Sequence, residues 1–367
     1  MDMELLFWMS AALIAYVYVG YPLLLAGWAR LAPRPPKKYQ FPAGHWPSLS
    51  IILAARNESA RLPVRLANLL TLPYDGPREV IVVSDGSTDG TREAVAPFAA
   101  QNEIRFVEVP AGGKPLALNA GVAVATGTIL VFADARQRFS PQALSALASN
   151  FADPQVGGVT GELILDCEFG ASASSIGEGV GAYWMYEKWL RRNESLVRST
   201  LGATGAIYAL RRSLWRPLPA ETLLDDVLAP MRVVLEGWRV VFEDQAIAMD
   251  RAAPDAAAEA RRKRRTLAGN YQILAQEPRL LLPIVNPVWL QYLSHKIGRL
   301  IVPWALVALL VASIALADDR WLYSVALAAQ LGFYGLAALG ARLEARDRQA
   351  EQRLATELPV AIGKEAH

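Results

Sequence analysis

The stretch Val80-Ile81-Val82-Val83-Ser84-Asp85-Gly86-Ser87-Thr88-Asp89-Gly90-Thr91 decides the fold of this chain. It opens with four β-branched apolar residues, a short run that is typical of a buried strand. Asp85-Gly86 is a turn sequence, and a helical pattern follows from Thr88 to Ala100. A buried strand that leads through a polar turn into a helix is one unit of a parallel α/β sheet.

The same alternation of strand and helix continues on both sides of this stretch. We expect strands at Ser50–Ala54, Val80–Ser84, Ile104–Val109 and Thr128–Ala133, and helices at Arg61–Leu70, Thr88–Ala100 and Pro115–Ala125. Right-handed connections would bring the carboxyl ends of these strands to one edge of the sheet, where open α/β sheets bind their ligands. The first half of the chain therefore predicts a Rossmann-like, mostly parallel sheet with a ligand site at one edge.

The pattern is less regular in the second half of the chain. We expect strands at Val156–Leu165 and Ala206–Leu210, and helices at Ile176–Arg192 and Leu224–Glu236. Residues 278–299 are apolar but are interrupted by Pro278, Pro283 and Pro287. Such a segment is short of a clean membrane span and is typical of an interfacial or re-entrant one.

Composition indicates a membrane protein. Apolar residues make up 53% of the 367, and charged residues only 20%, which is apolar for a soluble domain. Three uncharged stretches have about the 18 to 20 residues that cross a bilayer as a helix: Leu5–Ala29, Leu300–Ala317 and Trp321–Ala341. We expect the first to be a span and not a signal peptide, because Asp2 and Glu4 precede it where a signal peptide is basic.

The charges next to these stretches predict an orientation. Basic residues follow the first stretch, precede the second and follow the third, whereas Asp318 and Asp319 lie in the turn between the last two. The positive-inside rule then places the N-terminus outside and residues 33–299 in the cytoplasm, in the inner (plasma) membrane. A net charge of only +2 does not suggest a nucleic-acid partner. Cys167 is the only cysteine and the three histidines are scattered, so we expect neither an internal disulfide nor a zinc site.

Polar clusters follow three of the predicted strands at the point where each strand ends. They are Ala55-Arg56-Asn57-Glu58, the run Ser84–Thr91, and Asp134-Ala135-Arg136. Each alone has an ordinary explanation as a turn or a helix cap. Three such clusters at one edge of one sheet predict a binding site.

These clusters belong to an ordered set of motifs that resembles glycosyltransferase family 2, the inverting enzymes with the GT-A fold. The other members of the set are Gly113-Lys114-Pro115-Leu116-Ala117-Leu118-Asn119, Thr204-Gly205-Ala206-Ile207-Tyr208 and Leu224-Asp225-Asp226. Each motif alone is weak evidence, but the order and the spacing of the set are specific. The resemblance implies a membrane-bound hexosyltransferase with a nucleotide-sugar donor, which we expect to be a UDP-sugar. The chain has one N-terminal and two C-terminal apolar stretches, and this layout is similar to that of the processive synthases of chitin, hyaluronan and cellulose.

The resemblance implies a role for each residue on the donor side that matches a family motif. Asp85 would contact the nucleoside, with Asn57 and Glu58 beside it, and Lys114 would contact the phosphates. Asp134 resembles the first aspartate of the family's DxD motif, which holds Mg²⁺ or Mn²⁺ on the diphosphate. The third position of that motif is Arg136 instead of aspartate. Three alternatives stay open: Asp134 holds the metal alone, Arg136 binds a phosphate, or Arg136 forms a surface ion pair.

On the acceptor side, the resemblance makes Asp226 the general base that takes a proton from the attacking hydroxyl. Asp225 lies beside it and would raise its pKa, and Asp225 is also placed to cap the following helix. The low-specificity acceptor candidates are Thr204, Gly205, Trp184, Glu187 and Asp225. The aromatic ones are equally typical of a core or interfacial stripe.

Residues 261–265 are all basic and align partly with the Gln-x-x-Arg-Trp motif of processive members. Arg262 falls on the glutamine, Arg265 matches the arginine that would bind the diphosphate, and Thr266 replaces the tryptophan. The alternative for the rest of this run is attraction to anionic lipid, worth about 1 kcal/mol per charge.

The sequence therefore predicts six segments. They are a transmembrane helix at 1–32, a linker at 33–47, a GT-A domain at 48–275, interfacial helices at 276–299, two transmembrane helices at 300–341 and a charged cytoplasmic tail at 342–367. The predicted function is transfer of a sugar to a growing polysaccharide. The alternatives are transfer of one sugar to a lipid-linked acceptor, and an inactive membrane scaffold. Three spans are few for a translocation channel, so a processive enzyme would need a homo-oligomer or an export partner.

Overall fold

A computed structural model of the chain describes residues 2–39, 41–42, 44–100, 104–166, 175–251 and 256–362. Cys167 lies outside the described residues, as do the last five residues of the predicted tail. The chain divides into two compact units. The larger contains residues 21–254 and 258–297, and the smaller contains residues 1–20, 255–257 and 298–367.

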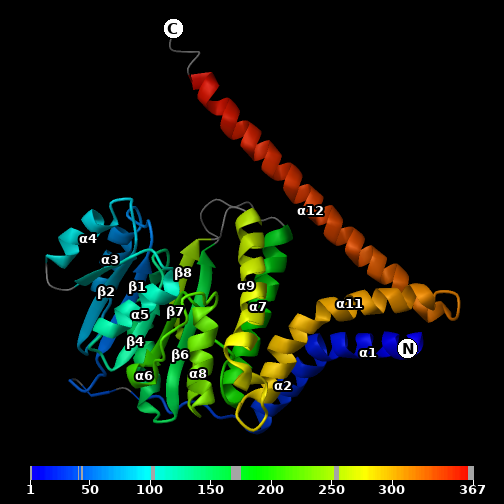
Figure 1. Cartoon of the computed structure of the whole chain (residues 1–367), viewed down its shortest axis with the longest axis horizontal. Helices are drawn as coiled ribbons and strands as arrows, with labels where there is room; N and C mark the ends of the chain where they lie inside the picture. Colours follow the sequence, from blue (N-terminus) through cyan, green and yellow to red (C-terminus); the bar gives the residue numbers. More distant parts are fainter. Residues whose placement is uncertain are drawn as a thin grey trace. The chain divides into compact units, whose positions relative to one another are not determined.

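The larger unit is built on an eight-stranded sheet with the strand order β3-β2-β1-β4-β7-β6-β8-β5 (Figure 1). The strands are β1 (Leu49–Ala55), β2 (Arg78–Asp85), β3 (Ile104–Val109), β4 (Ile129–Ala133), β5 (Arg138–Phe139), β6 (Val156–Asp166), β7 (Ile207–Arg211) and β8 (Arg239–Arg251). The first four are mutually parallel, and β7 runs antiparallel to both β4 and β6. The sheet is therefore mixed but mostly parallel, as predicted.

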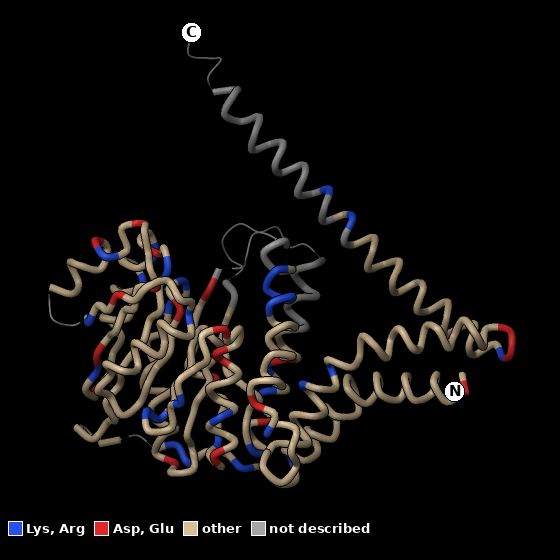
Figure 2. Tube along the Cα trace, viewed as in Figure 1, with Lys and Arg blue, Asp and Glu red and all other residues tan. Residues whose placement is uncertain are grey.

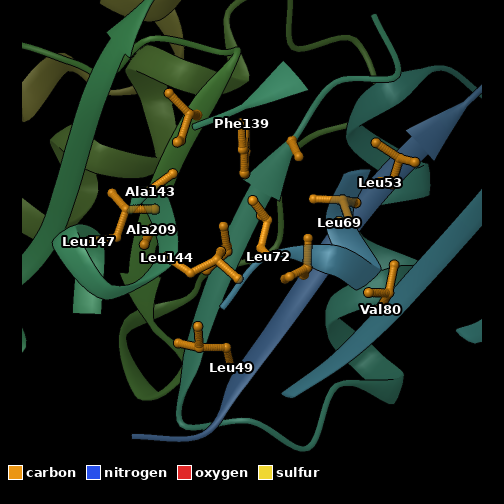
Figure 3. Close-up of a cluster of buried hydrophobic side chains, with 14 of the residues drawn as sticks. Leu49, Leu53, Leu69, Leu72, Val80, Phe139, Ala143, Leu144, Leu147 and Ala209 are labelled. Atoms are coloured by element: carbon orange, nitrogen blue, oxygen red, sulfur yellow. The ribbon is translucent and has the colours of Figure 1, made fainter. Parts of the chain in front are cut away.

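Helices cover both faces of this sheet. The helices α3 (Leu62–Thr71), α4 (Thr91–Ala99) and α6 (Ala143–Ser149) cover one face, and α5 (Lys114–Val124) and α8 (Asp225–Leu235) cover the other. Alternation along β1 explains this arrangement. Leu49 and Leu53 lie in one cluster with Leu69 of α3 (Figure 3), and Ile51 belongs to the same cluster. Ile52 belongs to the cluster on the α5 side. Burial of each such side chain contributes about 1.5–3 kcal/mol.

The remaining helices of the larger unit are α2 (Tyr21–Leu31), α7 (Ser175–Val197), α9 (Ala256–Gln276) and α10 (Trp289–Tyr292). Tyr21 and Leu25 of α2 pack on Leu190 of α7. A buried polar cluster reinforces this contact, because Glu194 accepts a hydrogen bond from Tyr21 at 3.0 Å and pairs with His295 Nδ1 at 2.6 Å. This cluster ties the segment after α10 to α7.

The smaller unit contains α1 (Met3–Ala15), α11 (Gly298–Ala315) and α12 (Trp321–Ile362). The helices α1 and α11 lie side by side (Figure 1). Phe7 of α1 packs against Ala312, Leu316 and Tyr323. Figure 2 shows that α11 and the first part of α12 carry almost no charged residues. Among the described residues, three helical stretches are long and apolar enough to cross a membrane: Met3–Leu31, Trp289–Ala315 and Trp321–Gly340.

Each strand and helix predicted from the sequence has a counterpart, with ends that differ by a few residues. Helix α4 begins at Thr91 and not at Thr88, because Gly90 adopts a left-handed φ of 80° and the Asp89 carboxylate accepts the Thr91 N–H. The second apolar helix begins eleven residues before Leu300, at Trp289, and continues through a π-helical turn at Leu293–Ile297. Strands β5 and β8 and helices α6 and α9 have no counterpart in the sequence prediction.

Candidate active site

The candidate site lies where the strand order reverses. Strands β2 and β3 follow β1 towards one edge of the sheet, and β4 and β7 lie on the other side of β1. At such a switch point, the loops after two neighbouring strands separate and leave a crevice at their carboxyl ends. The loops after β1, β2 and β4 and the first turns of α5 and α8 meet at this edge.

Asp85, the last residue of β2, is 3% exposed and held by backbone donors. Its Oδ1 accepts hydrogen bonds from the N–H groups of Gly112 at 2.7 Å and Gly113 at 3.0 Å. We call Asp85, Gly112 and Gly113 the Asp85 cradle. Gly113 has a φ of 91°, which side chains rarely adopt, so this loop needs glycine to present its N–H. The other carboxylate oxygen lies 3.8 Å from Arg56.

Asn57 and Glu58 lie beside the Asp85 cradle, in the loop after β1. Asn57 is the one described non-glycine residue with positive φ, at 55°. Its side-chain oxygen accepts the Thr88 N–H at 2.8 Å, so Asn57 joins the β1 and β2 loops. Glu58 pairs with Arg61 at 2.6 Å. The side chain of Asn57 thus has a clear role in shaping the donor edge, and a ligand contact of either residue stays a prediction.

The centre of the site is a group of charged side chains that we call the carboxylate–lysine cluster: Lys114, Asp134, Asp225 and Asp226. Lys114 Nζ lies 3.0 Å from Asp134 Oδ1 and 3.3 Å from Asp225 Oδ2. Burial works against the charge of Lys114, but the nearby carboxylates outweigh it and raise the pKa of Lys114 above its ordinary value. Lys114 is therefore a permanent cation that joins the end of β4 to the start of α8.

Asp226 has the properties that a general base requires. Burial, followed by the charge of Asp225, raises the pKa of Asp226 to about 6, while Lys114 and Lys296 oppose the shift. A base with a pKa near the working pH is the most effective one. A Cβ added to Gly205 would lie 2.9 Å from Asp226 Oδ2, so Gly205 leaves room for this carboxylate.

Asp225 does not cap α8, contrary to one expectation from the sequence. It is the first residue of the helix, Leu224 occupies the cap position, and no side-chain cap hydrogen bond forms there. The Asp225 carboxylate is instead 3% exposed and turned towards Lys114. The ion pair with Lys114 thus takes the place of a cap bond, which is worth about 1 kcal/mol.

Arg136 forms an ion pair with Asp250 at 3.2 Å, and Gln137 donates to the same carboxylate at 2.9 Å. The structure thus realises the surface ion pair among the three alternatives for Arg136. Asp134 then supplies the one carboxylate of the DxD position. Within the described part of the chain, no three or more histidine, cysteine and acidic side chains gather as a metal site.

Asp134 still fits a divalent ion of the kind that diphosphate-binding enzymes use. Its side chain is about one-third exposed, and Lys114 contacts it through Oδ1. Mg²⁺ and similar ions keep several water molecules and take further ligands from phosphates, so one protein carboxylate is enough. The residues present therefore fit a metal that is held mainly by the donor.

Arg65 supports the site and had no predicted role. It is 1% exposed, its Nε donates to the Asp134 carbonyl at 3.1 Å, and its guanidinium lies 4.1 Å from the Phe139 ring centroid. Burial lowers the pKa of Arg65 to about 9. Asn68, one turn later, binds both backbone groups of Phe139. An arginine on the apolar face of a helix, among Leu62, Leu66 and Leu69, was the available signal.

The predicted acceptor-side residues fall into two groups. Thr204 and Gly205 lie at the start of β7, where Thr204 accepts a hydrogen bond from Arg191 at 3.1 Å and Gly205 faces Asp226. Trp184 and Glu187 lie on α7. The Arg262 guanidinium is 5.9 Å from the Trp184 ring centroid, within cation–π range, and Glu187 lies 3.8 Å from His295 Nε2.

Arg265 reaches the start of α8. It donates to the Leu223 carbonyl at 2.9 Å, two residues before Asp225. Arg265 and Gly269 both belong to α9. Gly269 faces Leu224, which places α9 beside the first turn of α8. Arg265 is therefore close in space to the carboxylate–lysine cluster, and Arg262 contacts α7 instead.

Comparisons with known proteins agree with this architecture. Residues 50–214 match the family model described as glycosyl transferase family 2. The chain is 26% identical over 209 residues to poly-beta-1,6-N-acetyl-D-glucosamine synthase of Staphylococcus aureus (strain COL), and 24% identical over 206 residues to the synthase of the same name from Staphylococcus epidermidis. Each match covers 54% of this chain and 48% of the relative. The chain thus spans about half the length of these curated relatives.

A solved structure shares the fold over almost the whole chain. It is the mannosyltransferase PcManGT from Pyrobaculum calidifontis in complex with GDP-Man and Mn²⁺. The two structures superpose with a TM-score of 0.68 at 24% identity, over 91% of this chain and 92% of that one. The sheet order and this superposition together show the GT-A fold.

The sequence match makes the class more specific: residues 50–214, a little under half of the chain, match glycosyltransferase family 2. The matched residues include Asn57, Asp85, Lys114 and Asp134, together with Gly205. They end at Leu214, before Asp225 and Asp226. The assignment of the base therefore depends on the geometry around α8.

Proposed function

We propose that this enzyme transfers a hexose from a nucleotide sugar to a hydroxyl group of a growing polysaccharide, with inversion at the anomeric carbon. One observation carries the proposal. A carboxylate with the pKa of a general base, Asp226, belongs to the same charged cluster as Lys114 and Asp134, next to the Asp85 cradle. This arrangement supplies a base, a cation for phosphate and a nucleoside-binding carboxylate at one sheet edge.

The chemistry assigns one step to each part of the site. Asp85 binds donor groups of the nucleoside, and Lys114 leaves its carboxylate partners to bind the diphosphate. Asp226 accepts the proton of the acceptor hydroxyl as its oxygen forms a bond to the anomeric carbon, and the bond from that carbon to the diphosphate oxygen breaks. A divalent cation on Asp134 would neutralise the charge that develops on the leaving diphosphate.

The length of the product has two candidates. The curated relatives are named as synthases of a poly-N-acetylglucosamine, which supports a polymer. Thr266 stands where processive members have a tryptophan that would stack on the acceptor, which supports transfer of a single sugar to a lipid-linked acceptor. Retention of Asp85, Asp134 and Asp226 argues against an inactive scaffold, because a scaffold needs none of them.

We also propose that the chain spans the inner (plasma) membrane three times, with the N-terminus outside and the GT-A domain in the cytoplasm. The three apolar helices and their basic flanks support this placement. A short segment of the larger unit supports contact with the bilayer as well. Leu282 is 50% exposed and Ile284 98% exposed, and both lie just before the second apolar helix.

The experiment that tests the function is a transfer assay with purified protein in lipid nanodiscs. The donors are radiolabelled UDP-N-acetylglucosamine, UDP-glucose and GDP-mannose, each with Mg²⁺, Mn²⁺ or EDTA, and the products are sized on a gel. We expect one donor to give a polymer that needs the metal. A single-sugar lipid product would support the second candidate, and no transfer from any donor would contradict the proposed function.

A further inference from the structure

Tyr208 carries a buried hydroxyl group beside the carboxylate–lysine cluster. The residue belongs to β7 and pairs in register with Phe132 of β4, two residues before Asp134. Its ring stacks on Phe132, with centroids 4.6 Å apart, and the side chain is 1% exposed. Among the described residues, the Tyr208 hydroxyl has no hydrogen-bond partner. A buried hydroxyl without a partner is unfavourable, so its retention on β7 calls for a function.

A matching acceptor lies in the same cluster. Asp225 Oδ2 is also buried and receives no hydrogen bond from the described residues, although it is 3.3 Å from Lys114. Burial raises the pKa of Tyr208 well above its ordinary value. The negative charges of Asp225, Asp226 and Asp134 raise it further. Tyr208 thus stays protonated at any working pH and can only serve as a neutral hydrogen-bond donor to a charged acceptor.

We propose that Tyr208 is a positioning residue whose hydroxyl is hydrogen-bonded to Asp225 Oδ2 through one bound water molecule. The hydrogen bond keeps Asp225 charged and in place when Lys114 moves to the donor's phosphates. Asp226 is then the carboxylate of the pair that accepts the acceptor's proton. This inference rests on the proposed function for its role, but the hydrogen bond itself is independent of catalysis.

The proposal predicts a change in how the site depends on pH. The charged groups around the Tyr208 hydroxyl are Asp225 and Asp226 of α8 and Asp134 after β4. Two lysines, Lys114 and Lys296, act in turn on the Asp226 carboxylate. Removal of the donor disfavours the charged form of the Asp225–Asp226 pair, so the pair takes up a proton at higher pH. Base catalysis then weakens first at low pH.

The test compares Tyr208→Phe with the wild-type full-length protein in nanodiscs. This variant keeps the ring and its stack on Phe132. We expect kcat/KM to fall about ten-fold at pH 6 and less than about two-fold at pH 8, as the acid limb of the profile moves up. Tyr74→Phe is the matched control, because it removes a tyrosine hydroxyl that donates to the Pro47 carbonyl away from the cluster. Superposable profiles for Tyr208→Phe and wild type would overturn the proposal.

A second measurement does not need activity. Because the hydroxyl stabilises charged carboxylates, its loss should lower the thermal unfolding midpoint more at pH 8 than at pH 5. The same loss at both pH values would show a purely structural hydroxyl and overturn the inference. If the wild type transfers no sugar at all, the proposed function fails, and this difference in unfolding still decides whether the hydrogen bond exists.

Discussion

The two carboxylates at opposite ends of the site, Asp85 and Asp226, are held in opposite ways. Asp85 lies in a cradle of backbone N–H groups, which the chain supplies through the glycines of one loop. Asp226 lies among other charged side chains, and burial beside Asp225 raises its pKa to about 6. A carboxylate whose charge is stabilised by fixed hydrogen-bond donors is suited to binding. A carboxylate whose charged form is destabilised is suited to accepting a proton.

The largest effect should come from removal of the base. Asp226→Asn keeps the size of the side chain but cannot accept a proton, so we expect kcat to fall by about 10³-fold with the donor KM nearly unchanged. Steady-state transfer kinetics would measure this. Asp244→Asn is the control, because Asp244 pairs with Arg192 at 3.9 Å outside the cluster. A fall in kcat of less than about ten-fold would mean that Asp226 is not the base. The contrast with Asp85 would then no longer hold.

The pKa of Asp226 also gives a sign for the pH dependence. Since its folded-state pKa is raised to about 6 from 3.8, its contribution to stability is present below about pH 4 and is lost as the pH rises towards 6. In the same range, kcat/KM should rise with pH as the base loses its proton. Asp226→Asn should flatten the change in unfolding midpoint between pH 4 and 6, and an unchanged slope would contradict the assigned pKa.

The second effect tests how tightly the base is placed. A Cβ at Gly205 would meet Asp226 Oδ2 at 2.9 Å, closer than such contacts occur, so Gly205→Ala must displace the carboxylate. A displacement of this size should lower kcat by about 10²-fold. Gly335→Ala in α12 is the control, because a Cβ there has nothing within 4 Å. Full activity of Gly205→Ala would show that the position of Asp226 is not critical.

The third effect concerns the Asp85 cradle. Removal of Asp85 should weaken donor binding and lower the free energy of unfolding, and it should leave kcat nearly unchanged. Asp85→Ala leaves the N–H groups of Gly112 and Gly113 without their acceptor, which should cost about 1–3 kcal/mol of unfolding free energy. We expect the donor KM to rise about ten-fold. Denaturant unfolding and donor titration would measure the two changes, with Asp244→Ala as the control. A fall in kcat at constant KM would place Asp85 in the chemistry and break the comparison.

The two halves of the site also differed in how well the sequence predicted them. The strands and helices of the donor half, from β1 to β4, agree with the sequence prediction to within a few residues, because short apolar runs alternate there with helical patterns and each strand ends in a polar turn. Strand β8 was missed because Glu243, Asp244 and Gln245 interrupt its apolar pattern, and the register of β6 against β8 shifts at the same place. A bulge removes the period-2 signal that identifies a strand.

The contacts within the site could be predicted only where the backbone makes them. Asp225 was expected to cap a helix, the local role of an aspartate at that position, but it faces a lysine more than a hundred residues away. Arg65 and Tyr208 likewise act through partners on distant elements. Such pairings depend on how strands and helices pack, which the local pattern of a sequence does not encode.

The smallest expected effect is at Arg136, where the sequence left three alternatives. Its ion pair with Asp250 at 3.2 Å is half-exposed on the arginine side, and such pairs contribute about 0–1 kcal/mol. We therefore expect Arg136→Ala to change kcat/KM less than about three-fold. A phosphate ligand at this position would instead cost about 10²-fold, with most of the loss in the donor KM. The size of the Arg136→Ala effect separates the two cases, and Asp250→Asn is the matched control, because it removes the charge of the partner carboxylate and leaves the arginine in place.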